Sequence, residues 1–493
     1  MYQSFSGERT HRPRYDHEHP KYEDFVQLWD KCRTCYRGEE AVKNASQAYL
    51  PFLSAQESTE YYRYKSRAIY LNILKRTVQG LVGAAIRKTP IIDVPVGLES
   101  HMEDCDLMGT SITELIHDLL VELLITGRCT IVVDRMENSR TYLTKYSAES
   151  FMNWRMNMNV PTMATFAEEL DVTTDGYDHE LKTQYRVYEI DPAGDVRIKI
   201  ALEQTPDENS DEETTFEIVY ETVPTLMGVS LKRLPVFTMN STGLGFDTIE
   251  SPPLLDLANL SLSHYRTSAD LENGRHYTAL PQPWITGVDP DEHRNGIAVG
   301  GDTAWIIPNE AAKLGYLEFS GAGLGSLENA LSEKDQMMAI AGARLLESKK
   351  GVESAEVSRI RQNIETSILS SIVINLQNGI EKALKYMAEW EGMSPDDVNV
   401  ELNMDFVDVR IPHQEIIALV QSYQMGGISM DTLLHNLKQG EVIPSDVSIE
   451  EERDKIELDN GTVEQPQQDR SEVLKDSPEE KVRKELSDSG RGD

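Results

Sequence analysis

Residues 324–346 read LGSLENALSEKDQMMAIAGARLL, and their apolar side chains recur at intervals of three and four. This spacing predicts a helix with one narrow apolar stripe, typical of a helix that packs lengthwise against another. Lys334 is the one polar position on this seam. Such a seam suits the core between two helices of one chain as well as a contact between subunits. The candidates for a subunit contact are Leu327, Leu331, Met338 and Leu345.

The chain before this segment predicts a second helix over residues 251–273. Ser251 supplies an N-cap, Pro252 suits the first turn, and Asn273-Gly274 is a stop signal. Between the two helices, residues 276–322 are rich in Pro, Gly and Trp and look strand-like, but are too short to form a domain. The order of these segments predicts a hairpin of helices with a small strand-rich tip, an arrangement typical of an assembly component.

The chain after this segment contains the longest predicted helix. A polar stretch at 347–354 is followed by residues 356–390, whose unbroken apolar stripe predicts a helix of roughly 50 Å. Gly379 lies inside it and is expected to mark a bend, and Gly392 ends it. A strand pair is expected over 398–411 and helices over 412–439. Residues 450–493 hold fifteen acidic and eight basic residues and no aromatic one, so we expect a disordered tail.

The first half of the chain mixes both kinds of secondary structure, which predicts an α+β fold. We expect helices over 22–37, 58–88 and 111–127, the last with Ser111 or Thr113 as its cap, and a buried strand over 129–135. Alternating β-branched residues predict strands over 184–190, 196–202 and 215–221. The acidic run at 207–213 is expected to be an exposed loop, and residues 1–21 to be flexible.

Composition bounds the possible functions. A chain of 493 residues suggests about three domains of ~150 residues each. Its formal charge of −35 argues against a protein that wraps DNA or coats an anionic membrane with its whole surface. The apolar stretches are too short for a transmembrane helix, the N-terminus lacks the apolar core of a signal peptide, and four cysteines are too few for a disulfide framework.

Motifs for catalysis are absent from the sequence: it has no P-loop, no H-E-x-x-H and no G-x-S-x-G. We therefore expect no enzymatic activity and no cofactor. The best metal candidate combines His17 and His19 with Cys32 and Cys35, residue types that zinc sites use. However, the two cysteines lie on a predicted helix and the histidines in the flexible terminus, so a zinc-dependent enzyme is the weakest alternative.

Several motifs resemble the portal, or head–tail connector, proteins of tailed bacteriophages, and within them a branch described only as a domain of unknown function. The similarity follows the order of elements over roughly residues 22–455. The residues that carry it are Trp29 with Cys32, Tyr49-Leu50-Pro51, the run from Tyr62 to Asn72, Arg76-Thr77-Val78, Gly80-Leu81-Val82-Gly83, Arg87-Lys88-Thr89-Pro90, Gly342 to Glu347, and Gly351 to Ala355.

The resemblance implies a layout for this chain. It makes residues 22–250 an α/β wing, helices 251–275 and 325–346 a stem, and 276–324 a clip. It makes 347–355 a tunnel loop, 356–411 a kinked long helix with wing strands, and 412–449 a helical crown. The loop residues Ser348, Lys349, Lys350 and Gly351 would then face DNA in the channel.

The resemblance also implies a function. It predicts a ring of about twelve subunits at one capsid vertex, assembled in the host cytoplasm, through which double-stranded DNA is packaged and ejected. The implied partners are the terminase large subunit, the major capsid or scaffolding protein and a head–tail adaptor protein, with no membrane contact. The alternative is another virion or scaffold-type structural protein built on the same helical hairpin.

Overall fold

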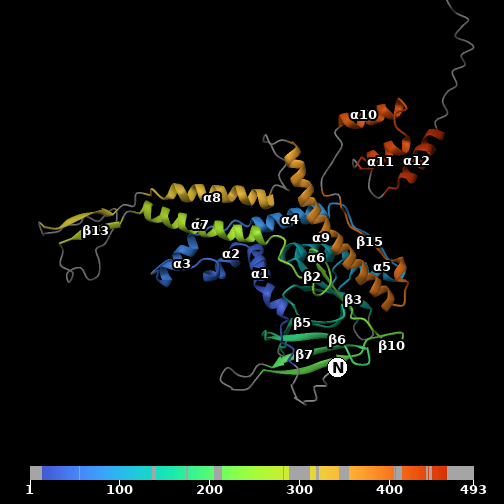
Figure 1. The fold of residues 1–493 in the computed structure, drawn as a ribbon, viewed down its shortest axis with the longest axis horizontal. Helices are drawn as coiled ribbons and strands as arrows, with labels where there is room; N and C mark the ends of the chain where they lie inside the picture. Colours follow the sequence, from blue (N-terminus) through green and yellow to red (C-terminus); the bar gives the residue numbers. More distant parts are fainter. Residues whose placement is uncertain are drawn as a thin grey trace, which may run out of the picture. The chain divides into compact units, whose positions relative to one another are not determined.

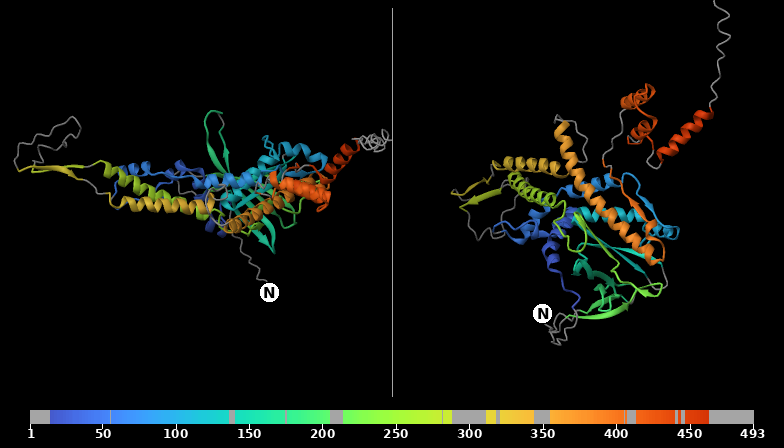
Figure 2. Two further views of the ribbon diagram at one scale, coloured as in Figure 1. Left: turned by 90° about the horizontal axis from the view of Figure 1, so that it is seen from above. Right: turned by 45° about the vertical axis from the view of Figure 1, so that its right-hand side comes forward.

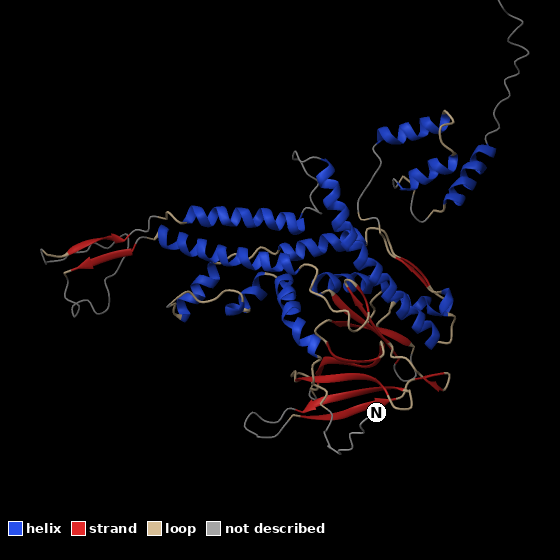
Figure 3. Cartoon of the chain, in the orientation of Figure 1, coloured by secondary structure: helices blue, strands red, loops and turns tan. Residues whose placement is uncertain are grey.

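The computed structural model (Figure 1) combines long helices with antiparallel sheets, which confirms the expected α+β class. It describes residues 14–54, 56–135, 140–173, 176–204, 214–280, 282–287, 311–317, 321–343, 355–404, 406, 413–439, 442–443 and 447–462. The chain divides into two compact units, residues 1–406 and 407–493. Figure 3 shows where helices and strands fall along it. The acidic run at 207–213 lies outside the described residues.

The helices predicted for the first half form, with one exception, and two short helices that were not predicted accompany them. They are α1 (Pro20–Arg37), α2 (Glu39–Asn44), α3 (Ser58–Arg67), α4 (Ile73–Ala85), α5 (Glu99–Glu103) and α6 (Ile112–Thr126). The expectation of one continuous helix over 58–88 is wrong, because residues 68–72 separate α3 from α4. Asn72 starts the second helix by accepting a hydrogen bond from the Lys75 backbone N–H at 3.0 Å.

The N-terminus of α6 confirms Ser111 as its cap. The Ser111 hydroxyl accepts a hydrogen bond from the Glu114 backbone N–H at 3.3 Å, and the Glu114 carboxylate accepts one from the Ser111 backbone N–H at 2.9 Å. This reciprocal capping box satisfies two backbone donors that the first turn leaves unpaired. Gly127 ends the helix in the left-handed conformation, with φ of 77°.

Two sheets follow α6. The first has the order β12-β11-β2-β3, from β2 (Arg128–Arg135), β3 (Thr141–Ser147), β11 (Val236–Asn240) and β12 (Gly243–Leu244). The second is a meander of β4 (Phe151–Asn157), β5 (Val160–Asp171), β6 (Leu181–Ile190), β7 (Val196–Gln204) and β8 (Thr215–Thr222). Strands β2, β6, β7 and β8 confirm four predicted strands. Short pairs join β1 (Ile91–Asp93) to β15 (Asn399–Glu401) and β9 (Thr225–Leu226) to β10 (Val229–Ser230).

A charged cluster joins the two sheets. Asp134, at the end of β2, accepts hydrogen bonds from Arg186 Nη1 and the Tyr188 hydroxyl of β6, both at 3.1 Å. Arg186 Nε also contacts Glu168 Oε1 of β5 at 2.9 Å. The Asp134 side chain is only 8% exposed, so its charge depends on these partners. Burial raises the pKa of the Asp134 carboxyl.

The segment matching the predicted hairpin contains α7 (Leu255–Ala279), β13 (Gln282–Thr286), β14 (Lys313–Leu317) and α8 (Leu324–Met338). A short π-helical stretch, Ala339–Ala343, continues α8. The predicted bounds of the first helix are wrong at both ends. The helix starts at Leu255 instead of near Ser251, and Asn273-Gly274 does not stop it. Figure 2 shows α7 and α8 side by side in two further views.

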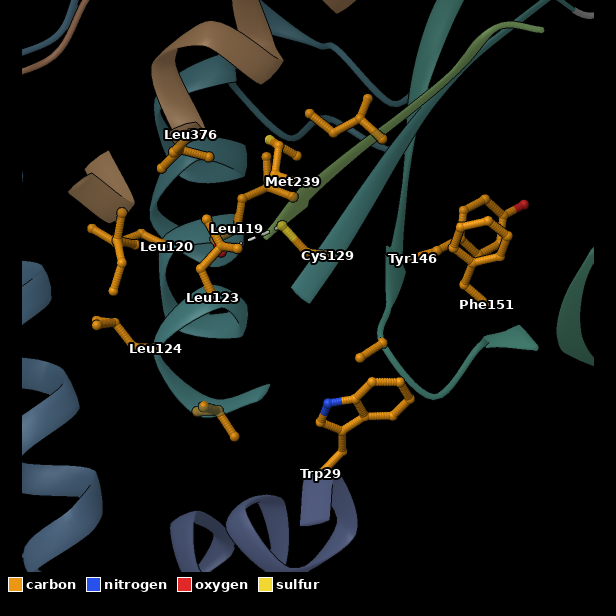
Figure 4. Packing of buried hydrophobic residues seen from close by; sticks show 14 of the residues in the cluster. Trp29, Leu119, Leu120, Leu123, Leu124, Cys129, Tyr146, Phe151, Met239 and Leu376 are labelled. Atoms are coloured by element: carbon orange, nitrogen blue, oxygen red, sulfur yellow. Dashed lines mark hydrogen bonds between the residues drawn. The ribbon is translucent and has the colours of Figure 1, made fainter. Parts of the chain in front are cut away.

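Helix α9 (Ala355–Trp390) supplies the apolar stripe that the sequence predicts, and Gly392, with φ of 77°, follows its end. Leu376 and Ile380 are fully buried, in the same core as α6 and β11. Figure 4 shows Leu376 near leucines of α6 and Met239 of β11. The structure gives Gly379 a reason to be glycine, whereas the bend expected there stays a prediction. A Cβ atom there would lie 2.3 Å from Cγ and Sδ of Met239, which is fully buried on β11. The missing side chain allows α9 to approach the sheet this closely.

The second unit holds α10 (His413–Gln424), α11 (Met430–Gln439) and α12 (Ile449–Thr462). Helix α12 contradicts the expected disorder of the tail over residues 450–462. Its start is a second capping box, in which the Ser448 hydroxyl accepts from the Glu451 N–H at 3.0 Å and the Glu451 carboxylate accepts from the Ser448 N–H at 3.1 Å. The acidic first turn, Glu450 to Glu452, further favours a helix because it complements the helix dipole.

Candidate functional site, the hairpin of α7 and α8

The candidate site is the pair of helices α7 and α8, which run antiparallel. Near the end of α7, Arg275 Nη2 contacts Glu328 Oε1 at 2.8 Å. Further back along α7, Lys334 Nζ donates to the Ser263 carbonyl at 3.1 Å. Later residues of α8 therefore contact earlier residues of α7, as expected for an antiparallel pair. Gly274, expected to stop the helix, instead serves this packing, because a Cβ there would lie 2.7 Å from Leu324 Cδ2.

A two-stranded ribbon connects the far ends of these helices. Strands β13 and β14 pair antiparallel, with Gln282 opposite Leu317. The ribbon exposes large apolar side chains, with Trp284 at 42%, Leu314 at 56% and Tyr316 at 61% exposure. An isolated two-stranded ribbon is at best marginally stable, and clustered exposed apolar side chains are typical of interaction surfaces. The ribbon is therefore the part of the hairpin best suited to contact another protein.

The segment that carries the resemblance holds α7 against the rest of the first unit. Tyr64 donates from its hydroxyl to Asp270 Oδ1 at 2.6 Å, and the Ile69 backbone N–H donates to Ser268 Oγ at 3.2 Å. On the same helix, Arg266 Nε donates to the Tyr49 carbonyl at 2.8 Å. Tyr64 is almost fully buried, and burial together with Asp270 raises the pKa of its hydroxyl. These contacts give the motif residues a structural role in positioning the hairpin.

Lys334, the polar residue of the seam, finds its hydrogen-bond acceptors within the same chain. Besides the Ser263 carbonyl, Lys334 Nζ donates to the Thr267 hydroxyl of α7. Burial lowers the pKa of the Lys334 amine. At the adjacent positions of the two helices, His264 Nε2 lies 3.2 Å from Asp335 Oδ1, and burial lowers the pKa of this imidazole. The α7–α8 contact thus contains specific polar pairs that fix the register of the two helices.

The predicted seam residues lie mainly on the side of α8 that faces α7. Met338 is 1% exposed and receives the Ser261 hydroxyl at 3.7 Å from its sulfur, so it belongs to the core of the chain. Leu327 and Leu331 are half-buried. Their contact with a neighbouring subunit stays a prediction. Leu345 and the loop residues Ser348, Lys349, Lys350 and Gly351 lie outside the described residues.

Three of the four residues of the zinc alternative take structural roles. Cys32 and Cys35 are fully buried, and burial raises the pKa of the Cys32 thiol to about 12. His19 accepts the Lys21 N–H at 3.2 Å as the N-cap of α1, and its ring stacks on Trp154 at 3.9 Å. His17 is exposed. Within the part of the chain that the structure describes, no group of three or more His, Cys, Asp or Glu residues is arranged to hold a metal ion.

Sequence reasoning identified the ribbon segment but not its exposed side chains. The signals available were the aromatic and β-branched residues of Trp284-Ile285-Thr286 and the alternation in Leu314-Gly315-Tyr316. Gly315 is explained only by the structure, since a Cβ there would lie 3.0 Å from the Trp284 ring. Across the described residues, no helix has the length and apolarity needed to cross a membrane.

We predict that Tyr64→Phe loosens the attachment of α7. The variant loses a charge-assisted hydrogen bond to Asp270, worth roughly 1 to 2 kcal/mol in a partly buried setting. Hydrogen exchange of the peptide covering residues 266–279 should accelerate more than that of α6. Tyr62→Phe is the matched control, because Tyr62 lies on the same helix and is 69% exposed. Equal exchange in the two variants would contradict this role for Tyr64.

Comparisons with known proteins give the following similarities. The sequence model of a family described as a domain of unknown function (DUF4055) matches residues 253–391, which run from the turn before α7 to the end of α9. No curated protein matches the chain. A solved structure of the virion of a native gene transfer agent particle has a TM-score of 0.38 and 12% identity, and covers 80% of this chain and 98% of its own.

Two further structures are of the neck of the same kind of particle. The neck of the native particle, computed with C12 symmetry, has a TM-score of 0.37 and 12% identity over 74% of this chain and 89% of its own. The neck of the empty particle, computed with C6 symmetry, has a TM-score of 0.37 and 12% identity. This match covers 76% of the present chain and 91% of the neck chain. TM-scores this low do not establish a shared fold.

Proposed function

We propose that this protein is a phage-type portal subunit, which assembles with copies of itself into a ring that conducts double-stranded DNA into and out of a capsid. The observation that carries the proposal is the antiparallel hairpin of α7 and α8 with an exposed apolar ribbon at its far end. A rigid pair of helices that projects an interaction surface away from the body suits a structural component better than an enzyme. We accordingly propose a role without catalysis.

The charge of the chain supports the same proposal. Each subunit carries a formal charge of −35, so a ring of about twelve subunits would be strongly anionic. An anionic channel repels the phosphate backbone and lets DNA slide without being held. Lys349 and Lys350 are the proposed cations at the narrowest point of the channel, where they would make brief contacts with DNA phosphates. Closed cyclic symmetry would repeat the same subunit contact around the ring.

The proposed partners are those that the resemblance implies, and each is assigned to a surface of this chain. The ribbon of β13 and β14 would bind the terminase large subunit during packaging and a head–tail adaptor protein afterwards. The major capsid or scaffolding protein would contact the sheets of the first unit. These contacts would place the protein at one vertex of the virion, after assembly in the host cytoplasm.

The proposal predicts a ring in solution. Negative-stain electron microscopy and mass photometry of the purified full chain should show particles with a central hole and a mass near twelve times 55.6 kDa. Trp284→Ser combined with Tyr316→Ser should leave the rings intact but weaken binding of a terminase subunit. A monomer that persists at high protein concentration would count against the ring and favour another kind of virion or scaffold protein.

A further inference from the structure

Helix α7 lies between α3 and α8, which pack on different sides of it (Figures 1 and 2). On one side, the Tyr64 hydroxyl of α3 donates to Asp270, and on the other, Lys334 of α8 donates to the Thr267 hydroxyl. The seam of α8 that the sequence predicts is used by the second contact, since Met338 is only 1% exposed. Both α3 and α8 keep an outer face that α7 does not cover.

The outer face of α3 combines a cation with large apolar side chains. Arg63 is exposed, and none of the described residues forms an ion pair with it. Tyr62 is 69% exposed on the same helix, and Ile69 and Leu71, just after it, are 47% and 38% exposed. We call these four residues the α3 face. Exposed apolar side chains beside a charge are typical of a surface that contacts another protein.

The α3 face belongs to a stretch of the chain without acidic residues. Residues 61–92 contain seven Lys and Arg residues and no Asp or Glu, whereas the whole chain has 83 acidic residues and a formal charge of −35. Copies of such an anionic chain repel one another over most of their surfaces. The α3 face is therefore a place where the acidic surface of a second copy meets attraction instead of repulsion.

The outer face of α8 offers the opposite charge. Glu333, Met337 and Ile340 follow one another at intervals of four and three, so they share one side of the helix and its π-helical continuation. Glu333 is exposed and has no ion-pair partner among the described residues, while Met337 is 53% and Ile340 44% exposed. Lys334, the only cation of α8, is bonded to α7. We call Glu333, Met337 and Ile340 the α8 face.

The charges of the two faces favour one way of joining copies. Two α3 faces in contact would bring together Arg63 of both copies, and two α8 faces would do the same with Glu333, so charge repulsion disfavours both symmetric pairings. An α3 face against an α8 face pairs opposite charges and covers apolar side chains on both. Because the two faces lie on different sides of α7, each copy can bind one neighbour through each of them.

We propose that the α3 face of one copy binds the α8 face of the next, with Arg63 of the first close to Glu333 of its neighbour. Repeated from copy to copy, this head-to-tail contact joins the hairpins side by side and closes into a ring when the rotation per copy allows it. The inference rests on the proposed function, because it names the contact that holds the proposed ring together.

Charge reversal in the full chain tests the pairing. Arg63→Glu and Glu333→Arg should each raise the concentration for half-assembly, measured by sedimentation velocity, by about tenfold or more, and the double variant should restore most of the assembly. Arg155→Glu is the control and should assemble normally, because Arg155 is exposed on β4 and has no ion-pair partner among the described residues. Equal assembly of all variants, or a double variant worse than either single one, would overturn the proposal. An unaltered chain that stays monomeric would overturn the proposed function together with this contact.

A disulfide test establishes which faces meet. All four native cysteines are fully buried, so newly introduced thiols are the reactive ones. A mixture of Tyr62→Cys chains with Met337→Cys chains should form cross-linked dimers under mild oxidation, whereas each variant alone should migrate as a monomer on a non-reducing denaturing gel. A chain that carries both substitutions should form a ladder of linked copies. Dimers from either variant alone, or none from the mixture while its rings remain intact, would contradict the head-to-tail contact.

Discussion

Gly379→Ala is expected to lower the free energy of unfolding of the first unit by about 2 to 3 kcal/mol. The added methyl group would lie 2.3 Å from two atoms of Met239, whose side chain is fully buried on β11. Either Met239 leaves its rotamer or α9 moves away from the sheet. Equilibrium urea unfolding, followed by tryptophan fluorescence, measures the loss.

Gly83→Ala is the matched control for this prediction. Gly83 lies inside helix α4, and no atom lies within 4 Å of the Cβ position there. Alanine favours a helix over glycine, so this variant should gain up to about 1 kcal/mol. A second check adds Met239→Ala to Gly379→Ala, which should recover part of the loss because the methyl group then has space. If both glycine variants gained stability, the close approach of α9 to β11 would be wrong.

Arg186→Met should have the second large effect, a loss of about 3 to 5 kcal/mol. The substitution keeps an unbranched side chain but leaves the Asp134 carboxylate buried without its cation. Arg197→Met is the control on the neighbouring strand. Arg197 pairs with Asp191 and Glu221 but is 39% exposed, and an exposed ion pair is worth no more than about 1 kcal/mol. Similar losses for the two variants would contradict a structural role for the buried cluster.

The pH dependence of the Arg186→Met variant provides an independent check. Burial already raises the pKa of the Asp134 carboxyl in the folded chain, and removing the guanidinium raises it further. A group with a raised pKa binds its proton more tightly in the folded state, so its contribution to stability falls as the pH rises above the ordinary carboxyl range. The deficit of the variant should therefore be smaller near pH 5 than at pH 8. A pH-independent deficit would point to lost packing instead.

Local patterns in the sequence were sufficient for many elements. Alternating β-branched residues predicted β6, β7 and β8, and the apolar stripe from Val357 to Met387 predicted α9. These elements follow from local periodicity, because a helix or strand must place its apolar side chains on one face. Ser111 is also a local signal, because a cap bonds to the first turn of the helix that directly follows it. The equivalent signal at Ser448 and Glu451 is present in the sequence too, although the acidic composition of the tail predicts disorder there.

Tertiary contacts decided the features that lack a local signature. Gly274 and Gly379 look like a stop and a bend in the sequence, yet each allows a close approach by a segment far along the chain. Arg128 opens a strand predicted from residue 129, and only the fold shows that it is buried, with its guanidinium 4.9 Å from the rings of Phe151 and Trp154. Periodicity reports which face of an element is buried, whereas the partner, the spacing and the pairing of charges arise only when distant segments meet.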